Sequence, residues 1–181
     1  MKLESLLQTD VRTANKEYVV IGLLGPTLDG GKGPERWERW RPMTSTQTSG
    51  KGTKEEPWNL KTPPGTSDFQ MYRDEKADPP ALVCIVGKTE LRYLPRCLDD
   101  LHAMLKARGD RMPLGSADEQ KPAAEGTVEA WGRSDENPVK GWYGLKKGLR
   151  GRFGMYVPPV LEALGLAEVE HNPKNNRMRA K

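Results

Sequence analysis

The chain has 181 residues, of which 29 are Lys or Arg and 25 are Asp or Glu, so its formal net charge at pH 7 is +4. This length fits one domain, or one domain with an appendage. Apolar residues make up 35% of the chain, and it contains 19 Gly and 15 Pro. That composition predicts one modest core with long loops and disfavours a large α/β enzyme. The mild positive charge is compatible with an anionic partner without requiring one.

The first segment shows no targeting signal. Residues 1–17 are polar with a weak helical pattern, which predicts a short amphipathic helix or a frayed end. The longest apolar run, Tyr18 to Leu24, is far shorter than the ~20 residues of a membrane helix. We therefore expect a cytoplasmic protein with no membrane partner. The run is β-branched and ends at Gly25-Pro26, so it predicts a buried strand.

A glycine-rich loop and the string RWERWRP follow this strand. Such a loop after a strand often cradles phosphate with its free N–H groups, but Gly33 after Lys32 breaks the Walker A spacing. Two interpretations of the string stay open. Its arginines and tryptophans could bind bases or a phosphate. Alternatively, Trp37 and Trp40 cover a core while the arginines face water.

Residues 16–42 resemble the opening of the CARF-type sensor domain of bacterial transcriptional activators of RNA-repair operons. The matching positions are Gly25, Thr27, Leu28, Asp29, Gly33, Arg36, Trp37, Trp40, Arg41 and Pro42. In that family a Rossmann-like sensor responds to RNA ends or cyclic oligonucleotides and precedes an ATPase and a DNA-binding domain. The resemblance implies a ligand-binding role for Gly25, Thr27, Asp29 and Arg41. Because only one strand and a loop match, it also implies a remnant or a fusion junction.

The composition predicts an appendage over residues 1–44, a polar linker over 45–56 and a single α+β domain over 57–181. Strands at 67–73, 81–87 and 91–94 predict an antiparallel meander. A helix is expected from Cys97 to Arg108, because Leu98, Leu101, Met104 and Leu105 share one face. Gly109 is a natural C-terminal stop for that helix.

Residues 110–137 read mostly as loop. Thr127 to Trp131 predicts a short strand, and Ser116 to Glu119 is a capping box for a short helix. Residues 57–180 resemble a bacterial domain family of unknown function. The strings LDDLHAML, GSADEQKPA, GTVEAWGRS, GWYGLKKGLRGRFGMY and VEHNPKNNRMRA carry this resemblance, which implies one domain and no particular activity.

The C-terminal module, residues 138–181, contains nine Lys/Arg against three Glu. The spacing of Trp142, Leu145 and Leu149 predicts a helix, and a turn follows at residues 152–154. A second helix is expected over residues 157–166, begun by Pro158-Pro159. Two short strands around the turn at 172–176 complete the order of a winged helix-turn-helix. The expected fold is therefore an α+β meander with a C-terminal winged-helix-like helix–hairpin.

This module predicts contacts to a nucleic-acid backbone. The expected phosphate contacts are Lys146, Lys147, Arg150, Arg152, Lys174, Arg177 and Arg179. Because the second helix carries only Glu162 as a charged residue, it is too apolar to read bases, and we expect DNA or RNA to be bound without sequence preference. Two alternatives stay open: a basic face that is merely solvated, and a protein-interaction module that uses the antiparallel sheet and the helix over 97–108.

Catalysis is not expected. The chain has two cysteines, Cys84 and Cys97, and two histidines, His102 and His171. Without a CxxC pair, the spacing excludes a zinc finger. Both cysteines lie in apolar patterns and are predicted to be reduced and partly buried. A Cys–His pair would need an orienting third group that no pattern identifies. We predict no metal and no cofactor.

Overall fold

The computed structural model describes residues 49–181. The predicted strand at 18–24, the glycine-rich loop and the RWERWRP string, with Gly25, Thr27, Asp29 and Arg41, lie outside the described residues. The α+β class is confirmed, because four strands form one sheet and a second, three-stranded sheet accompanies three helices. Among residues 49–181, no helix combines the length and the apolar character of a membrane span.

The predicted meander is present. It consists of β1 (Trp58–Lys61), β2 (Asp68–Asp74), β3 (Ala81–Val86) and β4 (Thr89–Tyr93), paired antiparallel in sequence order. The last three of these strands were predicted from the sequence, whereas β1 was not. Because side chains alternate between the faces of a strand, register decides which of them share the core. Trp58, Met71, Cys84 and Leu91 are aligned across the four strands, and all four are buried.

The loop before β1 is tied to the meander. The N–H of Asn59 donates to the carbonyl of Ser49 at 3.1 Å, and that of Arg73 donates to the carbonyl of Gly52 at 2.9 Å. Gly52 also lies against the Trp58 ring, where a Cβ atom would collide with it. The described end of the predicted 45–56 linker is therefore bonded to the sheet, and the domain boundary itself stays a prediction.

The predicted helix α1 (Cys97–Arg108) is confirmed. Gly109, with φ of 71°, ends it and donates its N–H to the carbonyl of Leu105. A smaller sheet follows the order β5-β7-β6, with β5 (Met112–Pro113), β6 (Ala167–Val169) and β7 (Arg177–Ala180). The predicted C-terminal hairpin, β6 and β7, is thus present and carries a third strand. Met178 of β7 is fully buried beneath α1.

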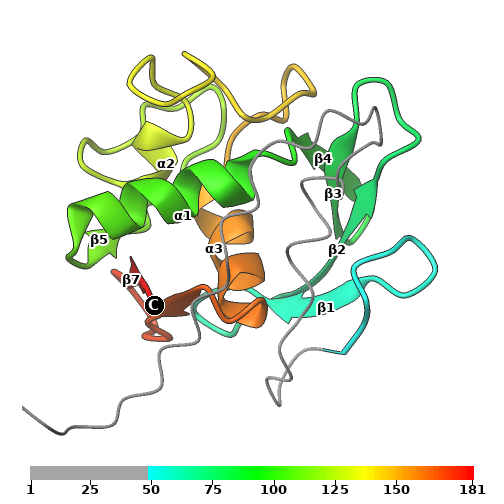
Figure 1. Ribbon diagram of the computed structural model, residues 1–181, viewed down its shortest axis with the longest axis horizontal. Helices are drawn as coiled ribbons and strands as arrows, with labels where there is room; N and C mark the ends of the chain where they lie inside the picture. The colour runs from blue at the N-terminus through cyan, green and yellow to red at the C-terminus, as the bar shows by residue number, and fades with distance from the viewer. Residues whose placement is uncertain (1–48) are drawn as a thin grey trace, which may run out of the picture. The chain divides into compact units, whose positions relative to one another are not determined.

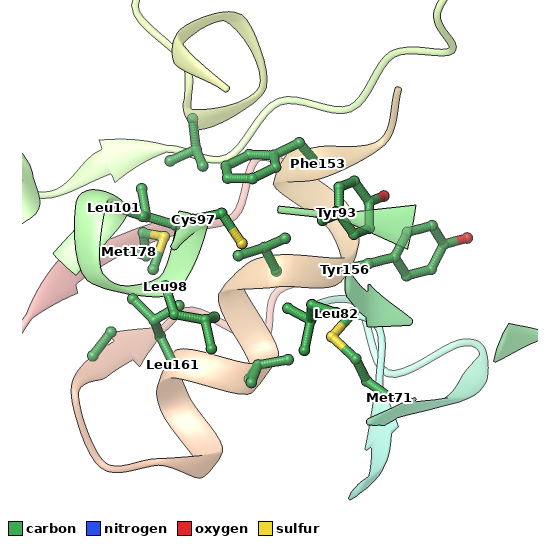
Figure 2. Packing of buried hydrophobic residues seen from close by; sticks show 14 of the residues in the cluster. Met71, Leu82, Tyr93, Cys97, Leu98, Leu101, Phe153, Tyr156, Leu161 and Met178 are labelled. Carbon is green, nitrogen blue, oxygen red and sulfur yellow. The ribbon is translucent and has the colours of Figure 1, made fainter. Parts of the chain in front are cut away.

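Helix α3 (Phe153–Ala163) lies between two layers, and nine of its eleven residues are buried. Figure 2 shows Leu98, Leu101 and Met178 on one side of this helix and Met71, Leu82 and Tyr93 on the other. Edge-on ring contacts join it to the meander, with Tyr156 5.1 Å from Phe69 and Phe153 5.9 Å from Tyr93, measured between ring centroids. The helix is therefore the centre of the core.

The predicted helix over residues 142–150 does not form. Gly144 pairs with Tyr93 beside β4, and the N–H of Leu145 donates to the carbonyl of Arg92 at 2.8 Å. Gly144 also lies against the backbone of Arg150 and leaves no room for a Cβ atom. Extended pairing with a sheet edge has therefore replaced the helix, and the predicted winged-helix pair lacks its first member.

Three other local predictions were wrong. Residues 127–131 are not a strand, because Thr127 caps the short helix α2 (Val128–Trp131) by accepting the N–H of Ala130. Residues 116–119 form no helix, since Asp118 and Glu119 bind arginines instead. Residues 152–154 are not a free turn: α3 already begins at Phe153, and Pro158 and Pro159 lie inside it.

Candidate nucleic-acid interface

Arg150 and Arg152, two of the predicted phosphate contacts, are held by carboxylates of the same domain. Arg150 donates from Nε and Nη2 to Oε1 of Glu119, at 3.0 and 2.7 Å, and from its backbone N–H to Oε2. Arg152 donates from Nε to Oδ1 of Asp118 at 2.6 Å. These hydrogen bonds lower the pKa of both carboxyl groups. The two guanidinium groups therefore fasten residues 118–119 to the start of α3.

A third arginine, Arg133, continues this pattern in a buried position. It pairs with Glu129 and donates to the carbonyls of Ala117 and Lys121, at 2.8 and 3.0 Å. Glu129 is fully buried and accepts the N–H of Gly154 at 2.8 Å, so its carboxylate caps α3. Burial raises its pKa, and Arg133 only partly offsets that effect. We call the following residues the arginine–carboxylate cluster: Asp118, Glu119, Glu129, Arg133, Arg150 and Arg152.

Lys146 and Lys147 lie close to this cluster in the chain but are arranged differently. Both are exposed, in the loop that pairs with β4. Neither forms an ion pair with another of the residues 49–181. Within residues 49–181 no carboxylate neutralises these two charges.

The other predicted contacts lie on the small sheet. Arg177 binds both carboxylate oxygens of Glu170, at 3.1 and 3.0 Å, and Arg179 binds Glu168 at 2.8 Å. These bonds lower the pKa of Glu168 and Glu170. The arginine side chains are about half exposed, at 53% and 50%. Lys174, in the exposed hairpin turn, has no ion pair within the described part of the chain.

Four basic residues that sequence reasoning missed accompany this sheet. They are Lys106, Arg108, Arg111 and Lys181. Arg111 precedes β5 and reaches Glu168 at 3.2 Å, while Lys106 and Arg108 end α1, which contacts β7. The basic last turn of α1 was visible in the sequence, but nothing local indicated that β7 lies beside it.

The structure does not bring all seven predicted contacts together. Arg152 immediately precedes α3, whereas β6 follows its end. Eleven residues at 1.5 Å each separate the two ends by about 16 Å. Figure 1 shows the 133–150 loops and β7 at opposite ends of this helix. Lys146, Lys147, Arg150 and Arg152 therefore form one group, and Lys174, Arg177 and Arg179 form another.

The family model described as a family of unknown function, DUF6855, matches residues 50–181. The chain belongs to this family. The model described as regulator of RNA terminal phosphate cyclase, RtcR, matches residues 16–51. Both resemblances stated from the sequence are thereby confirmed. No curated protein and no solved structure matches the chain.

Both cysteines of the DUF6855 domain are buried, and His171 contacts two other segments of the chain. Cys84 and Cys97 are free, buried thiols, and burial raises the pKa of both. Burial also lowers the pKa of His102. His171 links the hairpin to the rest of the fold, with Nδ1 3.0 Å from the carbonyl of Pro63 and Nε2 2.9 Å from Glu162. Among residues 49–181 no three His, Cys, Asp or Glu side chains are grouped as metal ligands.

The paired carboxylates predict how the stability of the DUF6855 domain depends on pH. A carboxyl group with a lowered pKa stabilises the fold fully above its unfolded value and loses that contribution as pH falls through the folded value. Asp118, Glu119, Glu168 and Glu170 are of this kind, with ordinary values of 3.8 for Asp and 4.5 for Glu. The raised pKa of Glu129 acts in the opposite direction, because its ionisation opposes folding.

Four carboxyl groups have a lowered pKa, and only Glu129 has a raised one. We therefore expect the urea concentration at the unfolding midpoint to fall as pH drops below about 4.5. Glu119→Gln and Glu170→Gln should each lower the midpoint at pH 7 and flatten its decline toward pH 3. Glu136→Gln is the control, since Glu136 is exposed and has no ion pair with another of the residues 49–181. Profiles for Glu119→Gln and Glu170→Gln that run parallel to the parent would contradict the assignment.

Proposed function

We propose that the domain is a non-catalytic nucleic-acid-binding protein that contacts the sugar–phosphate backbone through its small sheet. We use the name basic sheet surface for the Lys and Arg residues of this sheet and of the segments that flank it: Lys106, Arg108, Arg111, Lys174, Arg177, Arg179 and Lys181. Charge concentration carries this proposal: residues 106–113 and 167–181 hold seven Lys/Arg against three Asp/Glu, a net charge of +4. This equals the formal charge of the whole chain, so the other residues sum to zero. Electrostatic attraction to phosphate therefore favours this surface.

The order of elements also supports the proposal. From α1 to β7 the chain forms a helix, a strand, two helices and a hairpin, with the sheet order β5-β7-β6. This order is compatible with a winged helix-turn-helix in which the one-turn helix α2 replaces the predicted first helix and the hairpin is the wing. Here α3 takes the place of the recognition helix, but it is enclosed between two layers. Binding would therefore use the wing and its phosphate contacts, with no base reading by α3.

The carboxylate partners do not prevent such contacts. Arg177 and Arg179 are about half exposed, and water weakens ion pairs that it can reach, although Glu170 and Glu168 are less exposed, at 19% and 38%. A guanidinium group binds phosphate with the same two-pronged geometry that it uses for a carboxylate. Arg177 and Arg179 can thus exchange Glu170 and Glu168 for phosphate oxygens, while Lys174 and Lys181 have no such bond to exchange among residues 49–181.

A salt titration tests the proposal. Fluorescence anisotropy with a labelled generic duplex should show binding that weakens steeply between about 50 and 200 mM salt. The double variant Arg177→Ala/Arg179→Ala should bind more weakly at every salt concentration. It should also reduce the slope of log K against log salt by about 2.

The matched control is Lys54→Ala/Lys76→Ala, which removes two exposed charges near the meander. It should leave the slope unchanged. Absence of binding at low salt, or an equal loss in the control, would overturn the proposal. The alternative of a protein-interaction module predicts no salt-dependent binding of the duplex.

A further inference from the structure

A cavity of about 340 Å³ opens at the start of α3, at the opposite end from the basic sheet surface. Leu91, Leu149 and the ring of Tyr156 give it apolar walls, while Asp118, Gln120 and Arg152 contribute polar groups. Small-molecule sites typically enclose roughly 300–1,000 Å³ and combine apolar walls with a few polar groups. The cavity therefore has the size and the mixed lining of a site for one small planar group.

Interactions within the domain fix the walls of this cavity. Gln120 donates from Nε2 to the carbonyl of Gly148 at 3.3 Å, and the N–H of Arg152 donates to the carbonyl of Ala117 at 2.8 Å. The bond between Arg150 and Glu119 joins the same two segments. Tyr156 is only 6% exposed and packs on Phe69. The site is thus formed before any ligand arrives, which limits the entropy lost on binding.

Two features of the lining select the ligand. Asp118 uses Oδ1 to accept the bond from Arg152, while its Oδ2 lies 3.8 Å from Lys121 Nζ, so Oδ2 can still accept hydrogen bonds. Lys146 and Lys147 directly precede Gly148, which lines the cavity, and both are exposed. A cavity with apolar walls and a carboxylate acceptor, next in the chain to two exposed lysines, matches a base joined to a phosphate.

We propose that this cavity binds an unstacked nucleobase with an exocyclic amino group, which donates to Asp118, while Lys146 and Lys147 contact the adjoining phosphate. The inference rests on the proposed nucleic-acid binding and adds to it a base-accepting site for single strands. Adenine and cytosine carry an amino group at the position where thymine and uracil have a carbonyl oxygen, and guanine carries its amino group at the opposite, minor-groove edge. The cavity therefore favours amino-bearing bases.

Two kinds of probe test the site. Oligo-dC should bind about tenfold more tightly than oligo-dT of equal length, because one base-edge hydrogen bond decides between them. In methyl NMR, cytidine should shift the signals of Leu91 and Leu149, and uridine should do so more weakly. Since a nucleoside has no phosphate, Lys146→Ala/Lys147→Ala should weaken binding of the oligonucleotide and leave the cytidine shifts intact.

Two cavity variants sharpen the test. Asp118→Asn retains an acceptor for Arg152 and gains an amide donor, so it should shift the preference from oligo-dC toward oligo-dT. Leu149→Trp should fill the cavity. It should abolish both the preference for oligo-dC over oligo-dT and the NMR shifts that cytidine causes. Arg177→Ala/Arg179→Ala should weaken both oligonucleotides equally and keep their ratio.

The outcomes separate the two proposals. Equal affinity for oligo-dC and oligo-dT, together with cytidine shifts no larger than those of uridine, would overturn the base site. Salt-dependent duplex binding would then still support the basic sheet surface. Conversely, cytidine shifts that Leu149→Trp removes would support the cavity even in a protein that binds no duplex. A normal methyl spectrum for Leu149→Trp would show that this variant is folded.

Discussion

Replacing Glu129 with alanine is expected to lower the free energy of unfolding by about 3–5 kcal/mol. This is the usual cost of removing one partner of a buried ion pair. Glu129 is fully buried, and Arg133, its partner, is only 11% exposed. Removing the carboxylate leaves the Arg133 charge without its partner in a poorly hydrated position. The N–H of Gly154, at the start of α3, also loses its acceptor.

Urea denaturation at pH 7 with an unchanged m-value would measure this loss. Glu129→Gln should fall between the parent and Glu129→Ala, because the amide oxygen can still accept the N–H of Gly154. Glu136→Ala, at an exposed site, should change the stability by less than about 0.5 kcal/mol. A loss below about 1 kcal/mol for Glu129→Ala would contradict the capping and pairing roles given to this carboxylate.

The second large effect is expected for Gly154→Ala, at about 2–3 kcal/mol. Alanine normally favours a helix over glycine by about 1 kcal/mol, so the sign of this prediction runs against helix propensity. The reason is steric. A Cβ atom on Gly154 would collide with the carbonyl oxygen of Leu114 and lie 2.8 Å from that of Gly115. Because both obstacles are backbone atoms, the helix or the segment that follows β5 would have to move.

Thermal or urea unfolding of Gly154→Ala would test this close approach. Gly126→Ala is the matched control: Gly126 has φ of 70° and no atom within 4 Å of its Cβ position. That variant should lose only about 1 kcal/mol, from backbone conformation alone. Equal losses in the two variants would show that steric contact adds nothing at Gly154.

Much of the fold could be predicted from the sequence, because its signals were local. Helix α1 has an apolar stripe and ends at Gly109, and β3 is a short apolar run rich in Val and Ile that ends at a turn. The failures occurred where a distant partner decided the outcome. The apolar residues within 142–150 have the spacing of a helix. The segment is extended instead, because the N–H of Leu145 donates to the carbonyl of Arg92 in β4. No pattern within that segment indicates that β4 lies beside it.

The candidate site was less predictable, since a sequence shows charges without their partners. Arg150 and Glu119 are 31 positions apart, and yet their pairing decides that this arginine has a structural role. No local pattern indicated that Gly144, Gly151 and Gly154 lie against backbone, because the backbone in question belongs to other segments of the chain or to Arg150. The sequence did indicate that Lys174, Arg177 and Arg179 lie near one another, because they belong to one hairpin, and their role as phosphate contacts stays a prediction.

The central position of α3 affects how the protein folds. The meander and α1 both precede it in the sequence, and each buries its apolar face against it. During synthesis these earlier elements leave the ribosome before their main packing partner. About a hundred residues therefore cannot complete their core until residues 153–163 have been made. Their contacts with α3 span long stretches of chain, which slows folding. We therefore expect nascent chains that stop before Phe153 to expose apolar surface and to depend on chaperones.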